Sequence, residues 1–487
     1  MDQVAAIQEQ GADRADIAAS GGRRAREIVR RCLWWTALLV PPVLYLVYVA
    51  HYSVDVIFWD DWNTVPLVDQ VVHGHLPIAA MWAQHNENRM FLANVIFVLF
   101  GRFDHFDIRH VIFLSGALFV AAYLLLVATY KAYAGRSLEV VPLLLIGLVW
   151  FSLEDFQNAL WGFQVAWYLI IFLLMVMLFL MSRAVLSVPL LVAAALCATA
   201  ASFTSLQGLM LWPVGLLCIG WRIRDRKRFK WTTMSWVVGM LAVSALYFGG
   251  FNFSSTGTGG GSVSFAVRHP IGLLKYLLAA MGNIFPTSGV DLRLHEVIGV
   301  GMAILVVGVL WFSVLGWRRD TQVPLPAALI IFGLLFDLSA ALGRLSFGVD
   351  QALSSRYTMA NLLVLTGLAC YAFGPRRSGI HRRSRSMVGL AWASIAATGM
   401  ILAAQVGVSA NYGVSEATTT KQARLIEARL LVNLHEVPEP RRSNLVTLYA
   451  YPSLAVLTPW LAISRSDHLS VFAPGQVARY RSEGPPP

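Results

Sequence analysis

Long apolar runs separated by short polar segments dominate the pattern along the 487-residue chain. Because a helix that crosses a bilayer needs about 20 mostly apolar residues, the pattern predicts about eleven transmembrane helices, at 32–50, 109–129, 139–152, 165–182, 187–203, 208–221, 231–250, 296–317, 325–343, 357–374 and 387–407. A shorter run at 90–103 favours a helix in the membrane interface or against the bundle. The sequence therefore predicts an all-α polytopic membrane protein.

Composition supports this class. Hydrophobic residues make up 57% and charged residues 13% of the chain, with a mean hydropathy of +0.61, whereas a soluble protein carries about 25% charged residues. The formal net charge is +11, but the basic residues form short clusters between apolar runs, which argues against a nucleic acid partner. The four cysteines lie in apolar runs without the spacing of metal ligands or of a disulfide framework.

The basic clusters also predict which side of the membrane each loop faces. They precede the first predicted span and follow the even-numbered spans, as RIRDRKRFK at 222–230 does. Since lysine and arginine concentrate on the cytoplasmic side, we expect a cytoplasmic N-terminal segment at 1–31, a transmembrane module at 32–407 and an extracytoplasmic C-terminal tail at 408–487. In this tail, the segment 420–431 has the pattern of an amphipathic helix, and the remainder is expected to cap the outer face.

The first outer loop, 51–108, contains the stretch FWDDWNTVPLVDQ, in which Asp60 and Asp61 stand between two tryptophans. Two short amphipathic helices are expected after it, at Val65–His73 and Leu76–Trp82, lying on the membrane surface. They would hold the aspartates near the lipid headgroups, where a low dielectric raises the pKa of a carboxylate toward that of a general base. The alternative is a solvated acidic turn that caps the neighbouring helix.

Other polar groups gather on the same predicted face. A second acidic pair, Glu154 and Asp155, occupies another outer loop. In QHNENR, 84–89, His85 and Glu87 are candidates for catalysis or metal binding, with a hydrogen-bonded turn as the alternative. The segment SSTGTGGGS, 254–262, lacks the GK[ST] ending of a phosphate-binding loop and is interpreted as a flexible linker.

Basic residues on the outer side oppose the positive-inside bias, and a lipid phosphate is one reason for placing them there. Ion pairing to the outer carboxylates is the other reason. Arg344 and Arg356, at the ends of two predicted spans, are candidates for a phosphate clamp. The full set of outer candidates is Arg89, Arg268, Lys275, Arg293, Arg344 and Arg356.

Four short stretches together resemble the GT-C class of membrane glycosyltransferases: FWDDW at 58–62, HNENR at 85–89, LED at 153–155 and SSRYTMANLLVL at 354–365. The resemblance implies a GT-C-like fold and a sugar donor linked to polyprenyl phosphate. It also implies an inverting reaction in which an aspartate of the first loop, Asp60 or Asp61 with Asp60 preferred, acts as the general base.

The resemblance extends to further residues. It implies that Glu154 and Asp155, together with His85 and Glu87, shape the acceptor or metal site. The donor phosphate would be held by Arg356 with Arg344, Lys275 or Arg89. The predicted tail is shorter than the soluble C-terminal domain of several members of the class, so acceptor choice is expected to come from the loops and the tail.

The function expected from these features is transfer of a hexosyl or pentosyl group from the lipid-linked donor to a glycan or lipid acceptor of the cell envelope, at the outer face of a bacterial plasma membrane. Phosphate is a good leaving group, so the chemistry requires no cofactor, and the need for a divalent cation stays open. One alternative is a ligase or polymerase of lipid-linked glycans. Another is a transporter or flippase, for which Asp337 inside a predicted span is the only support.

Overall fold

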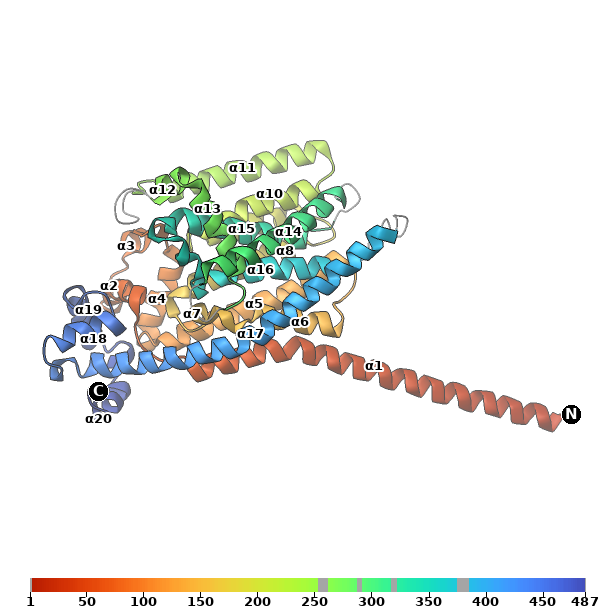
Figure 1. Ribbon diagram of the computed structural model, residues 1–487, viewed down its shortest axis with the longest axis horizontal. Helices are drawn as coiled ribbons and strands as arrows, with labels where there is room; N and C mark the ends of the chain where they lie inside the picture. The colour runs from red at the N-terminus through yellow and green to blue at the C-terminus, as the bar shows by residue number, and fades with distance from the viewer. Residues whose placement is uncertain (1, 253–261, 287–290, 317–321, 375–384, 487) are drawn as a thin grey trace.

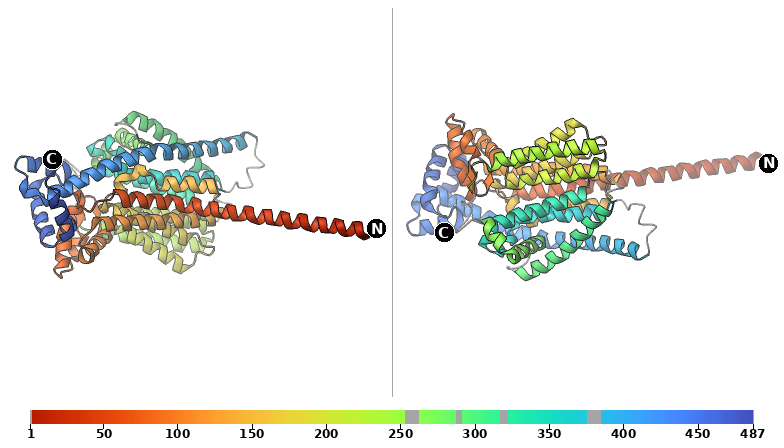
Figure 2. Two further views of the ribbon diagram at one scale, coloured as in Figure 1. Left: turned by 90° about the horizontal axis from the view of Figure 1, so that it is seen from below. Right: turned by 90° about the horizontal axis from the view of Figure 1, so that it is seen from above.

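The computed structural model describes residues 2–252, 262–286, 291–316, 322–374 and 385–486. Its helices run side by side in one bundle, and α1 (Asp2–Tyr52) extends far beyond the bundle toward the N-terminus (Figure 1). At the opposite end, the C-terminal helices lie beside α2 (Val65–Val72) and α3 (Ile78–Trp82), as all three views show (Figures 1 and 2). We call this the capped end. The predicted linker at 254–262 falls almost entirely outside the described residues, as does most of the basic segment 375–386.

Each predicted span coincides with a helix, which confirms an all-α polytopic membrane fold. Seven helical segments in the described residues are long and apolar enough to cross a membrane, or eight if a bent pair, Arg441–Tyr449 with Leu454–Ser466, is counted as one. The predicted spans at 187–203, 208–221, 357–374 and 387–407 are not among the seven. Two of them form helices of only 15 and 12 residues, so the number eleven stays a prediction. The seven segments are Arg24–Tyr52, Ile108–Ala134, Val140–Ala159, Gly162–Met181, Arg226–Phe248, Leu292–Gly316 and Leu325–Phe347.

The bundle is built from helices that follow one another along the chain. They are α5 (Ile108–Ala134), α6 (Val140–Trp150), α7 (Phe156–Ala159), α8 (Val165–Met181), α9 (Val188–Ser202), α10 (Leu211–Arg222), α11 (Arg226–Phe248), α12 (Ser262–Arg268), α13 (Pro270–Gly282), α14 (Leu292–Gly316), α15 (Leu325–Arg344) and α16 (Ser355–Ala372). Short 3-10 turns join several of them: η2 (Leu153–Asp155), η3 (Gly162–Gln164), η4 (Leu206–Met210), η6 (Leu345–Phe347) and η7 (Val349–Leu353).

Helices α15 and α16 pack closely because glycines lie between them. A Cβ atom at Gly333 would come within 2.6 Å of the carbonyl oxygen of Ala360, and one at Gly367 within 2.8 Å of that of Pro326. Small residues of this kind let helix backbones approach in membrane bundles. Since the chain turns back through only ten residues between them, the end of α15 and the start of α16 lie at the same end of the bundle.

The first outer loop folds largely as its sequence predicts. A 3-10 turn, η1 (Trp59–Thr64), leads into α2, which ends one residue before the predicted limit, and α3 begins at Ile78. A two-stranded hairpin follows, β1 (Gln84–His85) and β2 (Asn88–Arg89), and then α4 (Phe91–Asp104). The large side chains of Leu76, Ile78 and Phe103 remain exposed, as expected for helices at a membrane interface.

The C-terminal segment is continuous with the bundle. Helix α17 runs unbroken from Arg385 to Val432, so the predicted division at residue 408 falls inside a helix, and the predicted helix at 420–431 is its last part. The chain then forms η8 (Leu434–Glu436), α18 (Arg441–Tyr449), α19 (Leu454–Ser466), η9 (Ser470–Phe472) and α20 (Pro474–Ser482). We call residues 434–486 the cap. It contacts the first outer loop directly, because the backbone amide of Trp59 donates to the carbonyl of Ala450 at 3.4 Å.

Candidate active site

A polar pocket opens at the capped end of the bundle. Its walls come from the FWDDW turn, the hairpin, α8, η4 and the facing ends of α15 and α16. Its volume of about 60 Å³ holds roughly four to six water molecules, which is the scale of one small ligand group. The lining residues are Asp60, His85, Asn86, Glu87, Asn88, Met90, Phe163, Gln164, Ala166, Trp167, Ser205, Gln207, Ala340, Arg344, Arg356 and Tyr357.

The two adjacent aspartates point in different directions. Trp59 adopts a left-handed backbone conformation with φ of 46°, which is unusual for a bulky residue and sets the orientation of the turn. Asp60 lines the pocket and keeps 30% of its side chain exposed. Asp61 is buried, and its Oδ2 accepts from the amide of Phe58 at 3.4 Å. Burial raises the pKa of Asp61 well above its usual value, so only Asp60 is available to a ligand.

A buried ion pair on α17 packs against the FWDDW turn. The guanidinium of Arg424 lies 3.0 Å from the ring centroid of Phe58 and donates to Glu427 at 3.1 Å. Burial raises the pKa of Glu427 to about 8, although the charge of Arg424 opposes the shift. Arg424 also attracts the carboxylate of Asp61. This buried pair could not be predicted from the sequence, because Arg424 and Glu427 have the spacing of an ordinary surface pair on an amphipathic helix.

The hairpin brings His85 and Glu87 into the pocket. Asn86 occupies its turn with φ of 49°, a conformation that asparagine tolerates better than most residues. The Nε2 atom of His85 lies 3.9 Å from Oδ1 of Asp60. Glu87 forms an ion pair with Arg344 at 2.5 Å. Ion pairing to an outer carboxylate, the alternative that the sequence left open for the outer arginines, therefore holds for Arg344, and Glu87 largely neutralises its charge.

Arg356 is the cation in the pocket whose charge is not neutralised. Its buried Nε has no hydrogen-bond partner within the described part of the chain, where no carboxylate forms an ion pair with it either. The backbone around it is held firmly: Asn158 Nδ2 donates to the carbonyl of Arg356 at 2.8 Å, and Ser355 Oγ donates to the carbonyl of Glu154 at 2.6 Å. An unpaired arginine donor at a polar pocket suits an anionic group such as a phosphate.

Four residues expected at the site lie elsewhere. Glu154 and Asp155 do not line the pocket but are buried behind the start of α16, where Asp155 accepts from Asn158 at 2.6 Å. Their part is to support the segment that carries Arg356. The three guanidinium nitrogens of Arg89 donate to the carbonyls of Trp82, Tyr247 and Gly249, so Arg89 joins the hairpin to α11. Lys275 is exposed on α13 and does not line the pocket.

No three histidine, cysteine or acidic side chains of the pocket come close enough to share a metal ion in the part of the chain that the structure describes. Asp337, the support for a transporter, is buried inside α15 and accepts from Asn361 at 3.2 Å. The pocket offers the carboxylate of Asp60, the guanidinium of Arg356, the ion pair of Glu87 with Arg344, aromatic rings and several amide groups.

Comparison with known proteins gives only distant matches. No protein-family model matches the chain, and no curated protein sequence matches it either. Two crystal structures of the Archaeoglobus fulgidus oligosaccharyltransferase are similar at 13% identity over 86% of this chain, with TM-scores of 0.42 and 0.35. One is tethered with an acceptor peptide containing the NVT sequon, and the other is a complex with Zn and sulfate. The chain spans 59% and 57% of those two chains. At these scores the match does not establish a shared fold or activity, so the GT-C resemblance stays a prediction.

Proposed function

We propose that the protein is a membrane glycosyltransferase of the GT-C type, which moves a sugar from a polyprenyl-phosphate donor to a glycan or lipid acceptor. The observation that carries the proposal is that Asp60 and Arg356 line the same pocket at the capped end of the bundle. A carboxylate can take a proton from an acceptor hydroxyl, and an unpaired guanidinium can hold a leaving phosphate.

The reaction follows from these two groups. The acceptor hydroxyl gives its proton to the carboxylate of Asp60, and its oxygen forms a bond to the anomeric carbon of the sugar. The bond from that carbon to the phosphate oxygen breaks, its electron pair leaves with the phosphate, and the anomeric centre inverts. Arg356 stabilises the charge that develops on the departing lipid phosphate. His85, at 3.9 Å from Asp60, supports the orientation of the base.

Other pocket residues suit a sugar. The rings of Phe163, Trp167 and Tyr357 offer apolar faces, while Gln164 and Gln207 offer hydrogen-bond donors and acceptors. A pocket of about 60 Å³ takes one small group of the donor, so the lipid tail has to lie outside it, along the bundle surface. We place the pocket at the outer face of a bacterial plasma membrane, with the N-terminus cytoplasmic, because the basic segment 222–230, between α10 and α11, lies at the other end of the bundle (Figure 1).

The test is transfer of radiolabelled sugar from a panel of decaprenyl- and undecaprenyl-phosphate donors by purified protein in lipid nanodiscs. We expect Asp60→Asn to lower the rate by about 10²–10⁴ and Arg356→Gln to lower it at least tenfold. The matched control is Asp350→Asn, since Asp350 is an exposed aspartate of η7 that does not line the pocket. Equal transfer by the wild type and Asp60→Asn would overturn the assignment of the base. Activity with pyrophosphate-linked glycans alone would favour a ligase or polymerase.

A further inference from the structure

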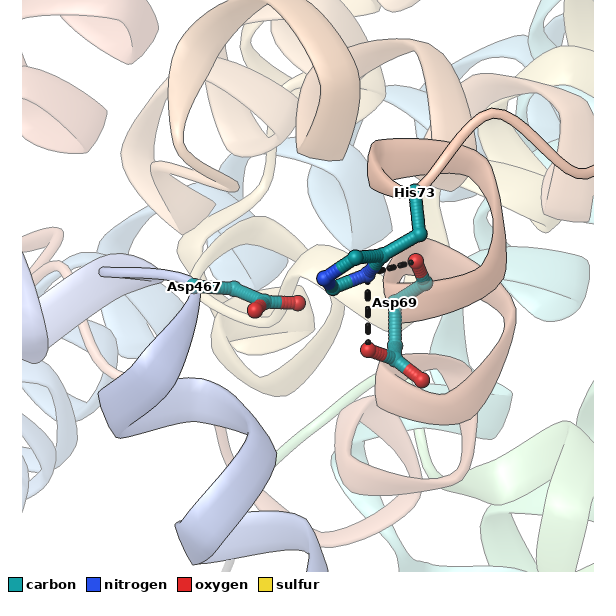
Figure 3. A group of neighbouring side chains, drawn as sticks. All are labelled: Asp69, His73 and Asp467. Carbon is teal, nitrogen blue, oxygen red and sulfur yellow. Dashed lines mark hydrogen bonds and ion pairs between the residues drawn. The ribbon is translucent and has the colours of Figure 1, made fainter.

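A second polar cluster lies outside the pocket, where α2 meets the cap. Asp69 and His73 stand four residues apart at the end of α2, and Asp467 follows directly after α19 (Figure 3). One potential ligand atom from each residue lies within 4.8 Å of the others. Segments almost at opposite ends of the sequence therefore bring two carboxylates and one imidazole together.

The imidazole of His73 is oriented by its own helix. Its Nδ1 lies 2.9 Å from the backbone carbonyl of Asp69 and 3.1 Å from Oδ1 of the same residue (Figure 3). Because both of these oxygens are acceptors, Nδ1 carries the proton and donates. In the neutral ring, Nε2 then has a free lone pair, and Figure 3 shows it on the side that faces Asp467. Histidine ligands to metals are commonly fixed in this way, through a hydrogen bond from the other ring nitrogen to a carbonyl or carboxylate.

Asp467 provides an independent sign of a ligand. Its Oδ1 accepts from the hydroxyl of Ser466 at 3.0 Å. Its Oδ2 is buried and has no hydrogen-bond partner within the described residues. A buried carboxylate oxygen without a donor is costly unless a cation or another group satisfies it.

We propose that Asp69, His73 and Asp467 bind a divalent transition-metal cation of the Zn²⁺ class. Two carboxylates balance the charge of the ion. An imidazole nitrogen favours Zn²⁺ and its neighbours over Mg²⁺ and Ca²⁺, which prefer all-oxygen sites. His73 Nε2 and one oxygen from each carboxylate form three ligands, and water completes the shell at this open surface.

The site clamps the cap to the first outer loop. Helices α2 and α19 already lie in contact, and the bond between Trp59 and Ala450 joins the cap to the turn that carries Asp60. A metal that bridges α2 to the end of α19 fixes the position of the cap beside the pocket. This role is structural and separate from the transfer chemistry.

The test is Zn²⁺ binding to the full-length, tag-free protein in detergent, stripped with EDTA and titrated by calorimetry, with native mass spectrometry for stoichiometry. We expect one high-affinity Zn²⁺ per chain, with at least about tenfold weaker binding in both His73→Gln and Asp467→Asn. His75→Gln is the matched control, because His75 is an exposed histidine of the same loop and is not in the cluster. Millimolar Mg²⁺ should not compete.

A second measurement reads the clamp itself. Zn²⁺ should slow hydrogen exchange in α2 and α19 of the wild type and leave the exchange of His73→Gln unchanged. Equal Zn²⁺ affinity in the wild type, His73→Gln and Asp467→Asn would overturn the proposal, as would the absence of saturable binding to the wild type. Neither readout involves sugar transfer, so the result is independent of the proposed enzyme activity.

Discussion

The buried pair formed by Arg424 and Glu427 makes a quantitative prediction about the capped end. Arg424 is the cation next to two buried carboxyl groups, those of Asp61 and Glu427. The change Arg424→Met keeps the length of the side chain and removes its charge. Removing one partner of a buried ion pair costs about 3–5 kcal/mol, because the remaining charge loses its compensation.

This cost should appear locally, in the stability of the contact between α17 and the FWDDW turn. A loss of about 3 kcal/mol corresponds to more than a hundredfold increase in opening, which hydrogen exchange detects where opening is local. At pH 9, where Glu427 is ionised in the wild type, we expect amides of 58–64 and 425–432 to exchange about a hundredfold faster in Arg424→Met than in the wild type. Lys421→Met is the control, since Lys421 is one turn earlier on α17 and donates to the carbonyl of His51 at 2.7 Å in an exposed contact.

The effect should also depend on pH. Burial raises the pKa of Glu427 to about 8. Below this pH its carboxyl group is protonated and uncharged, so removing the charge of Arg424 costs less stability. The difference between Arg424→Met and the wild type should therefore grow as the pH rises from 6 to 9, and Glu427→Gln in the same chain should restore part of the protection. Similar exchange in Arg424→Met and Lys421→Met at pH 9 would refute the reasoning.

Three further predictions concern other parts of the molecule. Burial and the neighbouring charge of Asp107 raise the pKa of Asp55 to about 7. Between about pH 4 and 7 the folded state therefore holds a proton that the unfolded state releases, so stability falls as the pH rises through this range. The melting temperature of Asp55→Asn should lack this fall, as thermal unfolding at several pH values would show. Asn158→Ala removes a donor to the carbonyl of Arg356 and should lower the transfer rate several-fold at unchanged expression. Gly299→Ala would place a Cβ atom 1.9 Å from a carbonyl oxygen of α13 and should lower the melting temperature by several degrees.

The candidate site could be predicted only in part. Asp60, His85, Glu87, Arg344 and Arg356 could be selected from the sequence because they are charged or polar residues in the segments between apolar runs. The structure places all five around one pocket. The same criterion also selected residues with structural roles. Glu154, Asp155, Arg89 and Lys275 carry the same charges at similar positions along the chain, but their side chains point into the bundle, toward carbonyl groups or into solvent.

The sequence by itself determined that this is a helical membrane protein and where its helices run, because the bilayer responds to the length and hydropathy of each segment alone. Tertiary structure decided which aspartate of the pair faces the pocket, since that depends on the ion pair beneath Asp61. It also decided that Asp467 meets His73 (Figure 3). The direction of a side chain in an irregular turn depends on partners distant in the chain, and no local pattern records them.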